Sequence, residues 1–286
     1  MASLEGDTRK CNACETALTS GPGDDYLRCP ECGFITRKHI PSADDVDELF
    51  SESYFKGNEY ADYLRERDSL EENFRSRVES LLNYIDAPKT KRLFEIGCAY
   101  GFFLNTAKGH FAALRGIDIS RSAVEYGQTE LGLDMESGDY LDTASASDFD
   151  IFCIWDSIPV IREPERYISK MADDITQGGL LAVSCGDVGS LNARMRGTNW
   201  RIIRQKTILH NFTRKSLTIL LERHGFQVID VLYPGVRRSV RAICRGVLGP
   251  DYETSLIGRL ITRLGLMDKS IILNLHDMMT VIAVRR

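Results

Sequence analysis

Four cysteines near the beginning of the chain have the residue type and the spacing of metal ligands. Two C-x-x-C pairs separated by fourteen residues supply Cys11, Cys14, Cys29 and Cys32. Four thiolates make a closed tetrahedral site for Zn²⁺ with no open position for catalysis, whereas a redox dithiol needs only one such pair. We therefore expect a structural zinc site in a ribbon over residues 1–40. So short a segment buries too little apolar surface to fold without the metal.

A second chemical pattern is the glycine loop Glu95-Ile96-Gly97-Cys98-Ala99-Tyr100-Gly101. An apolar strand-like stretch precedes it and an apolar run with helical spacing follows, so it joins a strand to a helix N-terminus, whose N–H groups can bind a ligand. The dinucleotide pattern G-x-G-x-x-G is absent, because Ala99 replaces its second glycine, which disfavours NAD-dependent oxidoreduction. Asp118 follows Gly97 by 21 residues. There it ends the next predicted strand, where a carboxylate can accept both hydroxyls of a ribose.

The pattern E-x-G-x-x-x-G, with Asp118 after it, resembles motif I of class I S-adenosylmethionine-dependent methyltransferases. The resemblance covers roughly residues 89–233 and 278–286. It implies an α/β, Rossmann-like seven-stranded sheet and S-adenosylmethionine as cofactor. In this resemblance Glu95, Gly97 and Gly101 place the methionine end of the cofactor, Asp118 binds the ribose and Asp139 meets the adenine. The implied cofactor-binding residues are Glu95, Gly97, Cys98, Ala99, Tyr100, Gly101, Asp118, Ile119, Asp139, Tyr140 and Trp155.

Two residues are candidates for removing a proton from the methyl acceptor. Asp156 ends an apolar strand at residues 149–156, and in an open α/β sheet that end lies at the ligand crevice. Related sequences commonly have Glu-His a few residues later, whereas this chain has Ser157-Ile158-Pro159. His210 is the histidine best placed for general base catalysis, since its pKa lies near working pH. A structural role for His210 is the alternative.

These residues must be positioned by elements that the spacing also predicts. Residues 64–86 form one helix, ended by Pro88, within a lid or linker over 41–88 in which Tyr60 and Tyr63 could cover the cofactor. The methyltransferase domain spans 89–286, and Thr213 caps one of its helices. An insertion over 235–277 carries an amphipathic helix at 256–264. The final strand, 278–284, pairs antiparallel beside the strand at 227–233.

Composition and charge limit the partners. The net charge of −5 gives no basic field for nucleic acid. There is no apolar run of membrane length and no signal peptide, so we expect a cytoplasmic protein without a membrane partner. The resemblance favours a small-molecule or sugar acceptor, and the insertion is compatible with a homo-oligomer. Two alternatives stay open: an RNA methyltransferase that uses the ribbon to bind nucleic acid, and a non-catalytic cofactor-binding assembly module. A basic cluster that could hold an anionic acceptor comprises Arg194, Arg196, Arg201 and Arg204.

Overall fold

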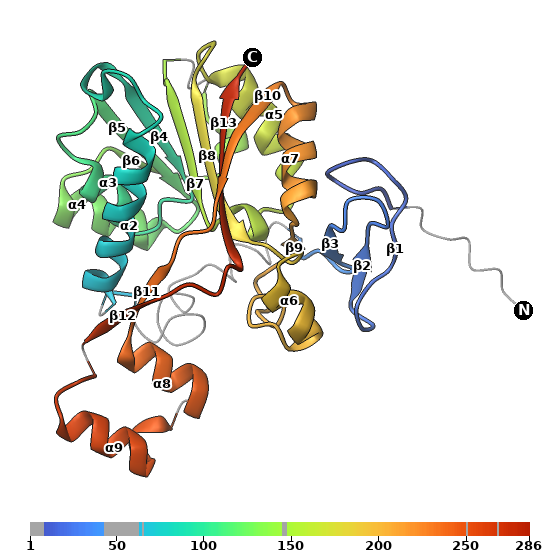
Figure 1. The fold of residues 1–286 in the computed structure, drawn as a ribbon. Coiled ribbons are helices and arrows are strands. Elements are labelled where there is room, and N and C mark those ends of the chain that lie inside the picture. The colour runs from blue at the N-terminus through green and yellow to red at the C-terminus, as the bar shows by residue number, and fades with distance from the viewer. Residues whose placement is uncertain (1–8, 43–62, 65, 145–147, 250, 268) are drawn as a thin grey trace, which may run out of the picture.

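The centre of the molecule is a seven-stranded sheet in the order β10-β13-β8-β7-β4-β5-β6 (Figure 1). The computed structural model describes residues 9–42, 63–64, 66–144, 148–249, 251–267 and 269–286. β13 runs antiparallel to both of its neighbours, and the pairs among β8, β7, β4, β5 and β6 are parallel. The strands are β4 (Arg92–Ile96), β5 (Ala113–Asp118), β6 (Met135–Ser137), β7 (Ile151–Trp155), β8 (Leu180–Gly186), β10 (Phe226–Leu232) and β13 (Met278–Arg285).

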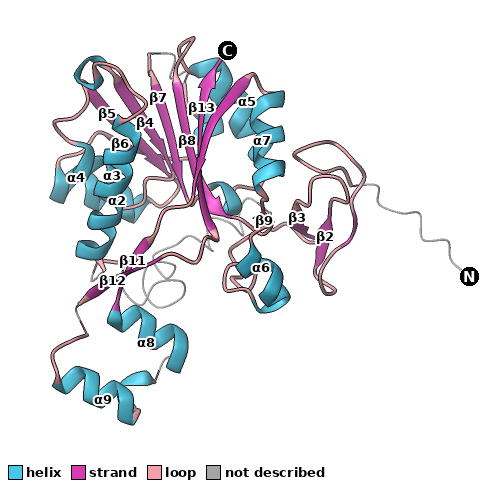
Figure 2. Cartoon of the chain, in the orientation of Figure 1, coloured by secondary structure: helices cyan, strands magenta, loops and turns pink. Residues whose placement is uncertain are grey.

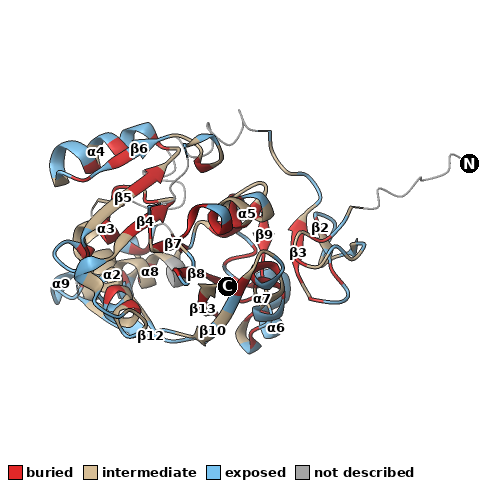
Figure 3. Ribbon diagram, turned by 90° about the horizontal axis from the view of Figure 1, so that it is seen from above, coloured by how far each residue is buried: buried red, intermediate tan, exposed pale blue. Residues whose placement is uncertain are grey.

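Helices cover both faces of this sheet (Figure 2). Because side chains alternate along a strand, Leu93 packs with one set of helices and Phe94 with the other. Both faces are therefore buried, as the continuously apolar sequence of β7 predicts for a parallel strand (Figure 3). One face packs against α2 (Arg67–Leu82), α3 (Phe102–Ala107) and α4 (Arg121–Leu131), and the other against α5 (Pro164–Asp174) and α7 (Arg214–Arg223).

The structure confirms the predicted fold class and corrects some boundaries. The last strand is antiparallel and lies beside β10, as expected. Thr213 caps α7 in a capping box with Ser216. The helix predicted over 64–86 is shorter: α2 ends at Leu82, before Pro88 can end it. Residues 43–62 of the predicted lid, including Tyr60, lie outside the described residues. Short elements near the sheet are η2 (Pro88–Thr90), η3 (Tyr140–Asp142), η4 (Ile158–Val160), α6 (Leu191–Arg196) and η5 (Gly197–Asn199).

The cysteine-rich segment forms a small sheet that the main domain completes. Its strands β1 (Thr19–Ser20), β2 (Tyr26–Arg28) and β3 (Ile35–Arg37) are joined by β9 (His210–Asn211), which pairs with β3. Thr213 donates a hydrogen bond from its Oγ1 to the carbonyl of Cys32 at 2.7 Å. The ribbon is thus attached to the main domain by backbone pairing and by a helix cap.

The chain between β10 and β13 forms a separate hairpin with two helices. β11 (Val236–Ser239) pairs antiparallel with β12 (Ser270–Leu273). Figure 1 shows the helices at the far end of this hairpin, away from the central sheet. The predicted amphipathic helix is confirmed as α9, while the hairpin and α8 were not predicted. The helices are α8 (Val240–Leu248), η6 (Tyr252–Thr254) and α9 (Leu256–Arg263).

Candidate active site

The loop between β4 and α3 needs glycine for both conformation and space. Gly97 and Gly101 have φ angles of 73° and 77°, which other residues rarely adopt. A Cβ atom on Gly97 would lie 2.3 Å from Oγ of Ser157, and one on Gly101 would lie 2.4 Å from Leu133. A side chain at either position would therefore collide with a neighbouring residue, Ser157 after β7 or Leu133 before β6.

Most of the loop's N–H groups bond to the protein itself. Gly97 and Cys98 both donate to the carbonyl of Ile117, at 2.8 and 3.1 Å. Ala99 donates to Oδ2 of Asp118 at 2.8 Å. The sequence predicted N–H groups free for a ligand, and the structure corrects this for these three. Side chains around the loop must therefore provide much of the binding to a cofactor.

Asp118 lies at the end of β5, beside the glycine loop. Its Oδ1 accepts a hydrogen bond from the N–H of Ser120 at 2.8 Å. Burial raises the pKa of Asp118, and its two backbone hydrogen bonds partly offset that effect. Each carboxylate oxygen can accept a second hydrogen bond. The side chain therefore keeps the capacity to bind a diol while it holds the loop in shape.

Glu95 is a buried carboxyl group with an unsatisfied oxygen. Its side chain is 2% exposed, and within the described part of the chain Oε2 has no hydrogen-bond partner. Burial raises the pKa of Glu95 well above its usual value, and the nearby charge of Arg77 acts against this. A buried oxygen without a partner costs about 1–3 kcal/mol. An ammonium donor, such as the amino group of the cofactor's methionine moiety, would satisfy it.

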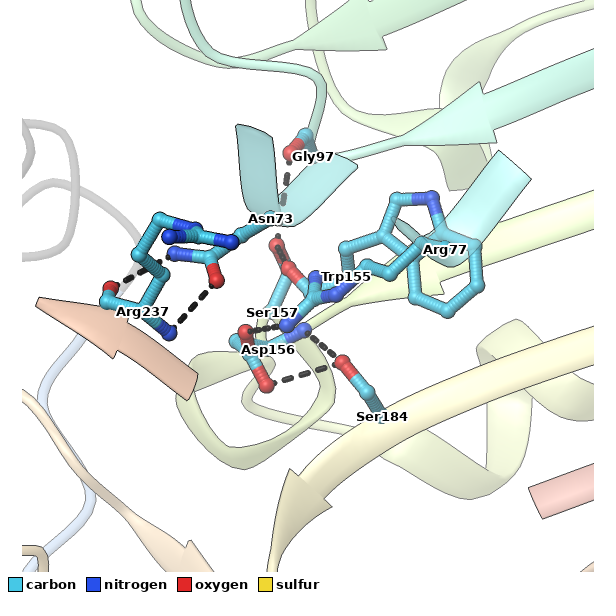
Figure 4. Close-up of polar contacts among 8 residues, drawn as sticks. All are labelled: Asn73, Arg77, Gly97, Trp155, Asp156, Ser157, Ser184 and Arg237. Atoms are coloured by element: carbon cyan, nitrogen blue, oxygen red, sulfur yellow. Dashed lines mark hydrogen bonds and ion pairs between the residues drawn. The ribbon is translucent and has the colours of Figure 1, made fainter. Parts of the chain in front are cut away.

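Asp156 follows β7 in the left-handed conformation, with a φ of 58°. Its carboxylate pairs with Arg77 at 2.6 Å and accepts a hydrogen bond from the Ser184 hydroxyl at 2.8 Å (Figure 4). The guanidinium of Arg77 also lies over the Trp155 ring, 4.9 Å from its centroid. Burial acts to raise the pKa of Asp156, but Arg77 and Ser184 outweigh it, so the pKa is lowered. A carboxylate of low pKa is a weak base at neutral pH.

Sequence reasoning missed Arg77 and Ser184. Arg77 reaches Asp156 from α2, 79 residues earlier in the chain. In the sequence it is one of several basic residues on an amphipathic helix, and no motif marks it. Ser184 lies in β8 opposite Trp155 of β7, so its contact with the next residue, Asp156, follows only from the strand register.

The residues predicted to lie near the adenine are held in different ways. Asp139 accepts hydrogen bonds from the N–H of Leu141 at 2.8 Å and from the hydroxyl of Tyr167 at 2.5 Å. Tyr140 is 1% exposed and donates to Asp174, so its side chain packs in the core and only its backbone could meet a cofactor. Ile119 is half-buried beside Asp118.

The side chains of Cys98 and Tyr100 in the glycine loop also face the protein interior. Cys98 is 4% exposed and packs against β5. Tyr100 stacks on Tyr63, with ring centroids 5.5 Å apart. Tyr63 belongs to the predicted lid, and the structure describes it. The segment before α2 therefore does pack on the glycine loop at Tyr63.

His210 does not belong to this site. It is fully buried in β9, where Nδ1 is paired with the Thr36 hydroxyl at 2.9 Å and Nε2 with the carbonyl of Arg162 at 3.2 Å. Its ring stacks on Phe34 of the ribbon, 5.6 Å away. A general base must reach the acceptor. The structure therefore contradicts the catalytic role predicted for His210, which instead holds the ribbon to the main domain.

Burial makes His210 a source of acid sensitivity. It lowers the pKa of His210 from 6.5 to about 4. As the pH falls below 6.5, the unfolded chain binds a proton that the native chain cannot, so stability decreases until about pH 4. Between pH 7 and 5.5 we expect His210 to account for about 1 kcal/mol of lost stability. In urea unfolding, His210→Gln should lose less stability over this range than wild type by that amount. The exposed His39→Gln variant should keep the wild-type difference, and equal differences in all three proteins would refute the assignment.

The four predicted ligands come together in the ribbon. The Sγ atoms of Cys11, Cys14, Cys29 and Cys32 all lie within 4.8 Å of one another. Three of these separations are 3.3, 3.5 and 3.6 Å. Tetrahedral bonds of about 2.3 Å to zinc would place the sulfur atoms about 3.8 Å apart. The donor set therefore fits Zn²⁺ in both chemistry and spacing.

Comparison with known proteins supports the same class of protein. The family described as "Methyltransferase domain" matches residues 63–231, more than half of the chain. The chain belongs to this family, and it is an enzyme of the S-adenosylmethionine-dependent methyltransferase class that the sequence predicted. No curated protein matches significantly.

Solved structures share the fold. An S-adenosylmethionine-dependent methyltransferase from Archaeoglobus fulgidus has a TM-score of 0.54 at 16% identity, covering 78% of this chain and 99% of its own. A possible histamine N-methyltransferase from Thermotoga maritima has a TM-score of 0.51 at 16% identity, covering 78% and 94%. The chain is also similar to a structure of a putative methyltransferase and its Trm112 activator from Haloferax volcanii, with a TM-score of 0.56 at 11% identity, covering 86% and 99%.

Proposed function

We propose that this enzyme transfers the methyl group of S-adenosylmethionine to an anionic small molecule, such as a sugar carrying a phosphate or carboxylate. The observation that carries the proposal is the charge around Asp156. Arg77 pairs with it directly, and Arg201 is close enough for its charge to lower the pKa of Asp156. Arg77 pairs with Asp156, and Arg201 lies 3.8 Å from Asp277, so both guanidinium groups are at the carboxyl ends of β7 and β8. A guanidinium group has five N–H donors, so each can offer further hydrogen bonds to an anionic acceptor. Of the other arginines in the basic cluster, Arg194, Arg196 and Arg204 are exposed around α6.

The residues near the crevice divide the work. The sulfonium cofactor supplies an activated methyl group when bound. Glu95 would hold its amino group, Asp118 its ribose and Asp139 its adenine. Asp156 positions Arg77, because its lowered pKa and the two polar contacts of its carboxylate suit a fixed anion rather than a base. The protein's main contribution is then to align the acceptor so that it attacks the methyl carbon and displaces the sulfur of the cofactor.

The proposal includes the structural zinc in residues 1–40, the lid over 41–88 and the catalytic domain over 89–286 with its insertion at 235–277. A cytoplasmic location agrees with a cysteine set made of four zinc ligands and four buried thiols, since disulfides are rare in that compartment. The resemblance of the fold to a possible histamine N-methyltransferase also favours a small acceptor over RNA. In the described part of the chain no helix could cross a membrane.

The acceptor class can be tested with methyl-labelled S-adenosylmethionine. Zinc-loaded protein is incubated with a cell extract divided into small molecules, RNA and protein. Label in anionic small molecules, separated by anion exchange, supports the proposal. Label that nuclease releases would instead identify an RNA methyltransferase. Tight cofactor binding with no label in any fraction would favour the non-catalytic assembly module.

Arg77 provides a sharper test of the same proposal. The Arg77→Met variant keeps a side chain that can pack on Trp155 but removes the charge. We expect kcat/KM for the acceptor fraction to fall at least tenfold, about 1.4 kcal/mol, while the affinity for S-adenosylhomocysteine changes much less. The matched control is Arg75→Met, which alters an exposed arginine of the same helix. Equal activity in the two variants would exclude Arg77 from the acceptor site.

A further inference from the structure

The insertion presents an apolar surface that the described protein does not cover. The exposed fraction is 79% for Leu256 and 58% for Leu260 in α9, and 61% for Ile272 in β12. Isolated exposed leucines are ordinary, but Leu256, Ile257, Leu260 and Leu264 recur on one face of α9, and an apolar face of this kind indicates a contact surface. We define the insertion surface as the exposed apolar side chains of this region: Leu256, Ile257, Leu260, Leu264, Leu266, Ile271, Ile272, Leu273 and Leu275.

The same segment is strongly basic. From Val236 to Leu273 it has seven arginine or lysine residues and three acidic ones, a net charge of +4, whereas the whole chain carries −5. A cavity of about 490 Å³ in this region is lined by Arg241, Arg259 and Arg263, with one acid, Glu253. Glu253 pairs with Arg241 at 3.2 Å, so the lining keeps a net positive charge. A phosphate group would complement it.

We propose that the insertion surface docks on an anionic lipid membrane. Short amphipathic helices with aliphatic residues on one face and arginines beside them bind the interface of such membranes, through buried apolar area and attraction to the headgroups. This proposal departs from the expectation that the protein has no membrane partner, which rests on the lack of an apolar run of membrane length and of a signal peptide. It does not depend on the identity of the methyl acceptor.

Two other partners fit less well. A second copy of the chain would bring one net charge of +4 against another. A nucleic acid would suit the charge, but single-stranded nucleic acids are held by stacking on aromatic rings. The exposed apolar residues described in the insertion are aliphatic, and Tyr252 is buried. A lipid surface uses both the charge and the aliphatic side chains.

The hairpin is joined firmly to the helix that carries Arg77. The Asn73 side chain donates to the carbonyl of Arg237 at 2.9 Å and accepts from its N–H at 2.7 Å (Figure 4). The Arg237 guanidinium pairs with Glu72 at 2.8 Å. Docking would therefore hold α2, and with it the Arg77 end of the crevice, in a fixed orientation to the membrane.

The test is sedimentation of the full zinc-loaded chain with vesicles of phosphatidylcholine, with and without phosphatidylglycerol. We expect binding at least tenfold tighter to the anionic vesicles, and its loss at high salt. Leu256→Glu should weaken it at least tenfold. Leu191→Glu is the matched control, because Leu191 and Leu256 each follow a serine N-cap and are 73% and 79% exposed.

Three results would overturn the proposal. The first is equal binding to neutral and anionic vesicles, which would leave the arginines without a role. The second is equal loss in both glutamate variants. The third is an absence of vesicle binding by a wild-type dimer that Leu256→Glu dissociates in sedimentation equilibrium, because a second copy would then cover the surface.

Discussion

Asp118→Ala should weaken the binding of S-adenosylhomocysteine at least tenfold, about 1.4 kcal/mol, in isothermal titration calorimetry. The substitution removes the carboxylate proposed to bind the ribose hydroxyls. It also leaves the N–H groups of Ala99 and Ser120 without their acceptor, which loosens both loops at the crevice. The product analogue needs no methyl acceptor, so the experiment does not depend on the acceptor's identity.

Glu136→Ala is the control for this experiment. Glu136 lies in β6, the strand paired with β5, and its side chain is 45% exposed in a salt bridge with Arg115. An exposed pair of this kind contributes little to stability. Both variants should stay folded by circular dichroism, and only Asp118→Ala should lose affinity. Unchanged affinity in Asp118→Ala would reject the proposed cofactor site, because the bond to the ribose is its most specific element.

Cys29→Ser should remove zinc from the purified protein and unfold the ribbon. Structural zinc contributes on the order of 10 kcal/mol to the folding of small zinc domains. Since β3 pairs with β9 and Cys32 accepts a bond from Thr213, loss of the ribbon should also expose the adjoining surface of the main domain. We expect the melting temperature to fall by roughly 5 °C or more. Metal analysis and limited proteolysis within residues 9–40 would measure the change directly.

The matched variant is Cys244→Ser, which alters a buried free thiol in the insertion, outside the cysteine cluster. It should keep one zinc per chain and the wild-type pattern of proteolysis. A wild-type protein that contains no zinc when grown with it, or that keeps its protease resistance after chelation, would contradict the proposed metal site.

Much of the site was predictable because its members are close in sequence. The two C-x-x-C pairs, the turn at Gly97 and the position of Asp118 all follow from spacing within one βαβ unit or one ribbon. Periodicity also located the strands along the chain, since buried parallel strands have a recognisable apolar sequence. In these cases local geometry constrains the residue types directly.

The tertiary structure alone decided the rest. His210 meets Thr36 across 174 residues, which turned a catalytic candidate into a buried contact. Arg77 meets Asp156 across 79 residues, and this pairing is the basis for proposing that the carboxylate positions Arg77. Spacing describes neighbours along the chain, whereas burial and pairing over such separations depend on how whole elements pack. The sequence by itself therefore determined which cofactor chemistry this protein has, and packing decided which side chains are free to take part.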